Sequence, residues 1–475
     1  MSLDQLIVRN AVQKTTINGL EFEYTATSAE TVLPGADGKP GATMFSFAYT
    51  RNGDNVRNRP IIFIWNGGPG SSSIFTHMVG FGPRTAIVPG PERYCVAPLQ
   101  VAQNPDSLLD VADLVFLDPP GTGFARLLPE GKPEDFFGVV PDAKAFSIFI
   151  KDWLVHYGRW ASPKFLMGQS YGTIRAPVVA RMLMGDVAGG ELAAVSLNGI
   201  ITLGQTMHYS NPMSSRGDTD FVMALPSQAA VAQYHTGGRG IVVSFHEMLA
   251  RVQEFCTSEY LPALYRGRDL GHDKTQTIAR TLEDFTGIPA SKWIRSNLKI
   301  STAAFCSALL EEHNLIVSPY DGRFVIDRPQ HFVDPVGDDP MLAPVAAAGV
   351  AALHDELRRC FDWDHNTNYV AIDFKSNARW DWKLPAPGEP AIGTVADIML
   401  ACLHRDPRLN LFMASGAYDL VTPWAAAEHV RTRRHIDDGR IEHRVYASGH
   451  SPFIGEENRA QISGDIRSFI KRVSP

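Results

Sequence analysis

The chain has 475 residues, a formal net charge of −7, 44% hydrophobic residues and 20% charged residues, which is an ordinary globular composition. This length exceeds what one compact core usually takes, so we expect a main domain that carries a large insertion. The acidic balance and the lack of any Lys/Arg-rich block argue against nucleic acid or a membrane surface as partner. No apolar run reaches the roughly 18 residues of a membrane span.

The beginning of the chain and its cysteines bear on the cellular compartment. The first ten residues carry no basic segment and no long apolar run, so no signal peptide is predicted and we expect a cytoplasmic protein. The five cysteines are widely spaced, which is typical of small buried thiols, although a Cys256–Cys306 bridge stays open. The 15 histidines form no metal-binding cluster, so we expect neither a metal nor another cofactor. The sequence does not indicate an oligomeric state.

The first 200 residues alternate strand-like and helix-like segments. Apolar and polar residues alternate over Glu21–Thr50, around a Gly/Pro-rich break at Leu33–Gly41, and predict an antiparallel hairpin. Short apolar runs predict buried strands at Pro60–Trp65, Asp113–Leu117, Lys164–Met167 and Leu192–Ile201, with helices at Pro141–Tyr157 and Tyr171–Met184. This alternation favours a mostly parallel sheet flanked by helices, and therefore the α/β class.

The alternation lapses between about Gly204 and Gly393 and then resumes. The interrupted region is mostly helical in pattern, at Ser244–Tyr265, Lys274–Thr286, Ser301–His313 and Ala343–Phe361, with loops at Ser318–Pro340 and Leu384–Pro390. Strands follow at Asn410–Ala414 and Arg440–Ala447, and a last helix at Glu456–Val473. We therefore predict a core from 1–203 and 394–475, interrupted by a mostly helical cap insertion over 204–393.

Ser170 lies at the centre of the pattern Gly168-Gln-Ser-Tyr-Gly172. A predicted strand precedes it and a predicted helix follows it, and the two glycines permit the sharp turn that lifts a serine hydroxyl above a sheet. The pattern alone is weak, but this context favours a nucleophile elbow over a chance match. Such an elbow also supplies the backbone N–H of Tyr171 to the oxyanion of a tetrahedral intermediate.

A serine nucleophile needs a base, and the base needs an acid to orient it. Asp419 follows the strand Asn410–Ala414, and His450 follows the strand that ends at Ala447. The order serine, acid, histidine and the position after strands are those of an α/β-hydrolase triad. The alternatives, a structural histidine and an ordinary loop aspartate, are disfavoured by this agreement.

The segment Asn66-Gly-Gly-Pro-Gly70 closes the strand Pro60–Trp65. Its glycines allow backbone N–H groups to point inward, where they can stabilise an oxyanion, although a simple tight turn would look the same. The serines that follow, Ser71–Ser73, are residue types that commonly begin a helix.

Together these motifs resemble the serine carboxypeptidase family, especially its bacterial branch. The resemblance rests on Trp65–Ser72, Asp118 with Gly121–Phe124, Gly168–Gly172, Ser415–Asp419 and Gly449-His450, and it extends from about Thr43 to Ile470. It implies an α/β-hydrolase fold with a helical insertion, and release of C-terminal residues from peptides. By this resemblance Ser170 is the nucleophile, His450 the base and Asp419 its orienting acid. It likewise implies Gly68 and Tyr171 as oxyanion-hole donors and Asn66 as a ligand of the substrate carboxylate.

Three positions depart from the family pattern. The family usually has Glu, often Cys and commonly Met where this chain has Gln169, Ser71 and Ser451, respectively. Ser71 fits a reducing compartment. Ser451 changes the pocket for the leaving residue and puts the familiar substrate preference in question.

Gln169 has three interpretations. As a permanent amide donor it can bind a substrate carboxylate at neutral pH, where a Glu of ordinary pKa would be ionised. Alternatively, carboxylate recognition is abandoned and the substrate is an ester or amide, or the amide is structural and bonds nearby backbone. We expect carboxylate binding by Asn66 and Gln169, and a serine-type carboxypeptidase acting on a peptide or small acyl substrate. The alternatives are an esterase, amidase or acyltransferase with the same triad and, disfavoured, an inactive binding protein.

Overall fold

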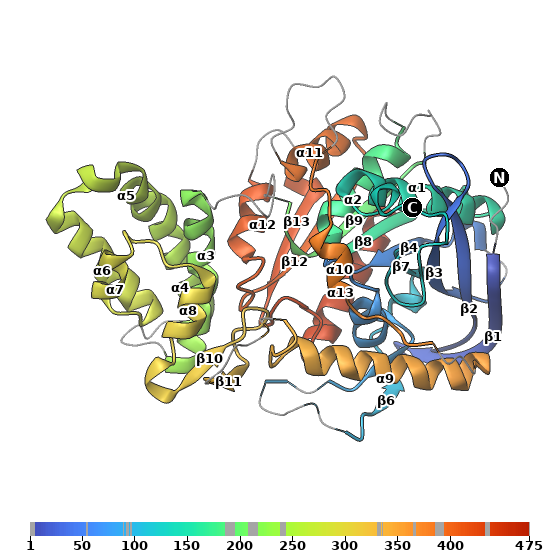
Figure 1. Cartoon of the computed structure of the whole chain (residues 1–475), viewed down its shortest axis with the longest axis horizontal. Helices are drawn as coiled ribbons and strands as arrows, with labels where there is room; N and C mark the ends of the chain where they lie inside the picture. Colours follow the sequence, from blue (N-terminus) through green and yellow to red (C-terminus); the bar gives the residue numbers. More distant parts are fainter. Residues whose placement is uncertain are drawn as a thin grey trace.

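A computed structural model describes residues 5–474 except 54–55, 89, 92–94, 96, 186–194, 208–216, 238–243, 330–333, 335, 364–366, 385–393 and 433–437. Its centre is a nine-stranded sheet in the order β1-β2-β3-β7-β4-β8-β9-β12-β13 (Figure 1). The strands are β1 (Gln5–Ile17), β2 (Leu20–Pro34), β3 (Pro40–Arg51), β4 (Ile61–Trp65), β7 (Asp113–Asp118), β8 (Lys164–Ser170), β9 (Gly199–Gln205), β12 (Asn410–Gly416) and β13 (Ile441–Tyr446).

The sheet is antiparallel on one side and parallel on the other. β1, β2, β3 and β7 pair antiparallel, whereas β7, β4, β8, β9, β12 and β13 pair parallel. The predicted hairpin is present, with β1 as an additional long edge strand. The predicted strand Leu192–Ile201 is placed too early: residues 192–194 lie outside the described part, and β9 begins only at Gly199.

Two helical layers bury the parallel strands from both faces. Phe63 and Trp65 of β4 pack in one hydrophobic core with α1 (Val139–His156), α2 (Gly172–Leu183) and α11 (Val395–Arg405). Ile62 and Ile64 pack in a second core with α9 (Leu342–Phe361) and α13 (Glu456–Val473). Burial on both faces explains why the central strands β4, β7 and β8 are mainly apolar, whereas the edge strand β13 is polar in part and only partly buried.

A third hydrophobic cluster belongs to a group of helices beside the β12–β13 edge of the sheet, drawn yellow-green in Figure 1. These helices are α3 (Asp218–Thr236), α4 (Phe245–Phe255), α5 (Leu261–Arg266), α6 (His272–Thr286), α7 (Ala290–Arg295) and α8 (Thr302–Ala308). Tyr418 and Leu420, from the loop after β12, belong to the same cluster. These helices therefore pack on the loop that carries Asp419. The limits of the cap insertion, 204–393, stay a prediction.

The remaining elements are short. They are β5 (Arg84–Ala86) with β6 (Val101–Gln103), β10 (Leu315–Val317) with β11 (Val325–Asp327), α10 (Phe374–Ala378) and α12 (Trp424–Arg431). β11 falls in the segment Ser318–Pro340, which the sequence predicts as a loop; the predicted loop Leu384–Pro390 lies, after Leu384, outside the described residues. All five cysteines are free thiols, so the structure contains no Cys256–Cys306 bridge.

Candidate active site

Ser170 occupies a strained turn between β8 and α2. Its φ of 56° lies in the left-handed region, which residues with a side chain adopt uncommonly. A Cβ on Gly168 would lie 2.1 Å from the carbonyl oxygen of Gly172, and one on Gly172 would lie 2.7 Å from a ring carbon of Trp65. Both flanking glycines are therefore sterically required, as the elbow pattern predicts.

His450 and Asp419 lie in the loops after the neighbouring parallel strands β13 and β12. The Nδ1 atom of His450 is 2.9 Å from Oδ2 of Asp419, and Asp419 is completely buried. The other carboxylate oxygen accepts the backbone N–H groups of Val421 and Thr422, both at 2.8 Å. Because Nδ1 faces the carboxylate, Nε2 is the ring nitrogen that can accept a proton from a nucleophile.

The end of β9 connects this pair to the elbow. Ser170 pairs in register with Gln205, and the preceding residue, Gly204, packs against the histidine. A Cβ on Gly204 would lie 3.3 Å from Nδ1 of His450. The structure thus brings Ser170, His450 and Asp419 to the same edge of the sheet, the carboxyl ends of the parallel strands.

The glycine-rich loop after β4 packs directly on the elbow. A Cβ on Gly67 would lie 2.4 Å from the backbone nitrogen of Tyr171, so the two backbones approach as closely as glycine allows. The phenol of Tyr171 accepts a hydrogen bond of 3.1 Å from Trp380 Nε1, and burial raises the pKa of this phenol well above its ordinary value. The side chain is therefore fixed in the core. That Gly68 and Tyr171 donate to an oxyanion stays a prediction.

The side chains of Asn66 and Gln169 bond each other and the loop after β13 that carries His450 and Ser451, here called the histidine loop. Asn66 Nδ2 donates to Gln169 Oε1 at 2.5 Å, and Gln169 Nε2 donates to Ser451 Oγ at 2.7 Å and to the carbonyl oxygen of His450 at 3.2 Å. Gln169 is 2% exposed, and both its amide hydrogens are used in this way. Carboxylate binding through Gln169 would require one of these bonds to be exchanged, and it stays a prediction.

Residues from the interrupted region border the site on two sides. The backbone N–H of His450 donates to Tyr320 O at 2.6 Å, and the N–H of Asp373 donates to Gly70 O at 2.7 Å. Thr422 also touches the pair, because its hydroxyl donates to Asp419 Oδ2 and lies 3.1 Å from His450 Nδ1. The sequence analysis missed Tyr320 and Thr422. Only the proximity of Thr422 to Asp419 in the chain could have indicated it.

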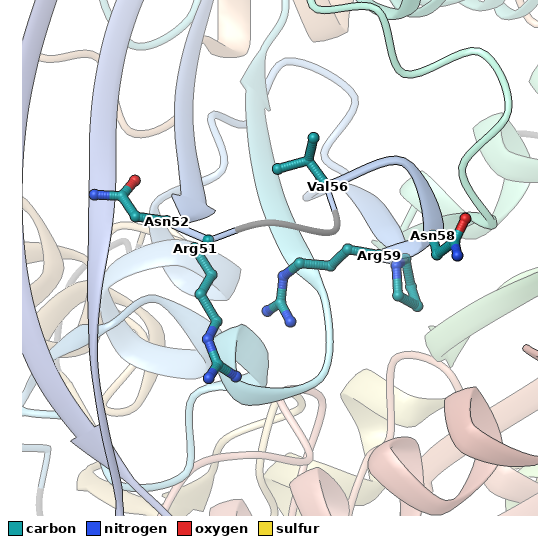
Figure 2. A pocket seen from close by; sticks show the side chains of 7 residues that line it. Arg51, Asn52, Val56, Asn58 and Arg59 are labelled. Atoms are coloured by element: carbon teal, nitrogen blue, oxygen red, sulfur yellow. The ribbon is translucent and has the colours of Figure 1, made fainter.

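A separate depression of about 370 Å³ lies at the other end of β4, where Pro60 precedes the strand (Figure 2). Arg51 and Arg59 line it, and Arg59 Nε donates to the buried Asp113 at 2.7 Å. Since a five-residue strand spans roughly 17 Å, this depression is remote from the elbow. It plays no part in the candidate active site.

Comparisons with known proteins bear on the family and on the fold. A family model described as serine carboxypeptidase matches residues 34–262, which include the elbow and the glycine-rich loop. Over this region the chain is similar to the serine carboxypeptidases. The family resemblance drawn from the motifs is therefore confirmed.

Two curated relatives come from Arabidopsis thaliana. Serine carboxypeptidase-like 20 is 25% identical over 206 residues, which cover 39% of this chain and 40% of the relative. Serine carboxypeptidase-like 2 is 25% identical over 232 residues, which cover 46% of this chain and 50% of the relative. The matches thus span about half, or less, of these relatives' own length.

A solved structure resembles this chain over most of its length. The chain is similar to Kex1(delta)p, a prohormone-processing carboxypeptidase from Saccharomyces cerevisiae, with 14% identity, a TM-score of 0.55 and coverage of 94% of this chain and 92% of that one. At this identity the likeness concerns the fold alone. The predicted α/β-hydrolase fold is confirmed.

Within the described residues, no group of three or more His, Cys, Asp or Glu side chains is arranged to hold a metal ion. Among the helices that the structure describes, none is both long and apolar enough to cross a membrane.

Proposed function

We propose that this chain is a serine hydrolase that removes C-terminal residues from peptides through an acyl-enzyme on Ser170. One observation carries the proposal: a serine in a strained elbow shares a sheet edge with a His450–Asp419 pair whose Nδ1–Oδ2 distance is 2.9 Å. The family match supports peptides as the substrate class.

The geometry supports a two-step reaction. The Oγ atom of Ser170 attacks the scissile carbonyl carbon while its proton passes to Nε2 of His450, and Asp419 stabilises the resulting imidazolium. Backbone N–H groups of Gly68 and Tyr171 stabilise the oxyanion, and the protonated histidine then gives its proton to the leaving amine. A water molecule, deprotonated by His450, then attacks the ester carbonyl. As the ester bond breaks, His450 returns this proton to Oγ of Ser170. These steps use no metal or other cofactor.

A second candidate uses the same triad on another acyl group, as an esterase, amidase or acyltransferase. The observation that favours it is the bonding of Gln169, whose amide hydrogens are both held by the histidine loop. An ester or amide substrate would need no donor from this side chain. Fold and triad alone do not decide between the candidates.

A substrate panel separates the two candidates. Purified protein is incubated with blocked dipeptides, with their C-terminal amides and with simple acyl esters. Cleavage of the free-carboxylate dipeptides supports the carboxypeptidase, and turnover of esters or amides alone supports the second candidate. Absence both of turnover and of labelling by a fluorophosphonate would overturn the two together. Cytoplasmic localisation remains part of the proposal, and cell fractionation tests it.

A further inference from the structure

A buried chain of hydrogen bonds runs from the helix after the glycine-rich loop to the histidine loop. The backbone N–H of Thr76 donates to Asn66 Oδ1 at 3.1 Å, and Asn66 donates in turn to Gln169 Oε1. Gln169 then donates to Ser451 Oγ and to the carbonyl oxygen of His450. The three side chains in this network are each at most 3% exposed: Asn66, Gln169 and Ser451.

The orientation of both side-chain amides in this hydrogen-bond network is fixed by their neighbours. The N–H of Thr76 can only donate, so Asn66 must present its oxygen to Thr76 and its nitrogen to Gln169. Gln169 must therefore present its oxygen to Asn66 and its nitrogen to the carbonyl of His450, which can only accept. The side-chain amide of Gln169 therefore has one possible orientation, in which its nitrogen donates to the histidine loop.

We propose that Gln169 is a positioning residue for the base, holding His450 through its carbonyl and through Ser451 without touching substrate. His450 is then held at three points: its Nδ1 by Asp419, its N–H by Tyr320 and its carbonyl by Gln169. The proposal rests on the proposed function and goes beyond it, because it assigns Gln169 a role in every acyl transfer at Ser170, whatever the substrate carries at its end.

The test measures the rate at which a fluorophosphonate, which has no carboxylate, labels Ser170. Gln169→Met keeps the length of the side chain and removes its hydrogen bonds. It should slow labelling about 10–100-fold, since the bonds to the carbonyl of His450 and to the hydroxyl of Ser451 are both lost. Ser451→Ala removes one bond and should slow it less. Gln228→Met is the matched control, because Gln228 is an equally buried glutamine, at 2% exposure, in α3; its labelling rate should be unchanged.

Turnover separates positioning from substrate binding. For whichever substrates the wild-type protein turns over, Gln169→Met should lower kcat by a similar factor on a simple ester and on a free-carboxylate peptide, with little change in KM. An unchanged labelling rate would overturn the proposal. So would a loss confined to KM for the free-carboxylate peptide, because that would make Gln169 a ligand of the substrate.

Gln169→Glu gives a readout that does not depend on the methionine variant folding. A carboxyl at this position donates to the histidine loop only while protonated, and its ionised form faces the carbonyl oxygen of His450. The ratio of the variant's labelling rate to that of wild type should therefore fall as the pH rises from about 5 to about 8. A constant ratio would refute the positioning role. Failure of wild type to be labelled at Ser170 would instead refute the proposed function.

Discussion

Arg175 and Asp142 form a buried ion pair directly behind the nucleophile elbow. The Nε atom of Arg175 is 2.6 Å from Oδ2 of Asp142, and the two side chains are 0% and 2% exposed. Arg175 also donates to the carbonyl oxygen of Asn66 at 2.8 Å. One guanidinium thus connects α2, which begins at the elbow, to α1 and to the glycine-rich loop.

Removal of Asp142 should destabilise the protein strongly. Asp142→Ala leaves the charge of Arg175 buried without its partner, and such a loss costs about 3–5 kcal/mol of unfolding free energy. Urea unfolding followed by circular dichroism measures it. The control is Glu247→Ala, which breaks an exposed pair with Arg251 and should cost about 0.5 kcal/mol or less. Equal costs for the two variants would show that the buried pair is not needed.

Labelling by a fluorophosphonate should be confined to Ser170. Ser170→Ala should abolish labelling and lower turnover by about 10⁴-fold or more, while the circular dichroism spectrum and melting temperature stay near those of wild type. Mass spectrometry of the digested, labelled protein identifies the modified residue. If labelling survives Ser170→Ala, another residue is the nucleophile and the elbow assignment is wrong.

The hydroxyl of Thr422 should contribute to catalysis through Asp419. It donates to the carboxylate oxygen that faces His450, while the two backbone N–H donors on the other oxygen remain when it is removed. Thr422→Val should therefore lower kcat about 10-fold, the effect of one hydrogen bond to a charged group. Asp419→Asn should lower it by about 10⁴-fold, because the imidazole loses its orienting charge. Steady-state kinetics that give equal losses for both variants would contradict this ranking.

The sequence predicted those parts of the molecule whose structure leaves a pattern within a few consecutive residues. β4, β7 and β8 are buried on both faces, so each leaves a continuous apolar run, and the elbow requires glycines on both sides of Ser170. β9 was placed too early because the apolar run around it continues across residues that are not in the strand. The helix α3 went unrecognised because its buried residues do not follow a single helical face.

The surroundings of the triad depend on contacts that are distant in the chain. Tyr320 contacts His450 at a sequence separation of 130 residues, and Gln169 contacts Ser451 at a separation of 282. Neither pair leaves a periodic or spaced pattern in the sequence, so motifs indicated the candidate triad residues but not the groups that contact them.

Asp118 is buried among neutral donors at the end of β7. Its carboxylate accepts the N–H and the hydroxyl of Ser73, each at 2.7 Å, and the phenol of Tyr369 at 2.8 Å. Burial outweighs these three hydrogen bonds and raises the pKa of Asp118 from 3.8 to about 6. The folded protein therefore holds this proton more tightly than the unfolded chain does.

The stability of the protein depends on pH through Asp118, because its pKa is higher in the folded state than in the unfolded state. Between about pH 4 and pH 6 the folded state binds more protons at Asp118 than the unfolded state, so this group's contribution to stability falls as the pH rises. Asp118→Asn has the same size and does not titrate. The unfolding free energy of wild type minus that of Asp118→Asn should thus decrease by about 2 kcal/mol between pH 4 and pH 7. Urea unfolding of both proteins across this range measures the difference. A difference that does not change with pH would mean that Asp118 ionises alike in the folded and unfolded states.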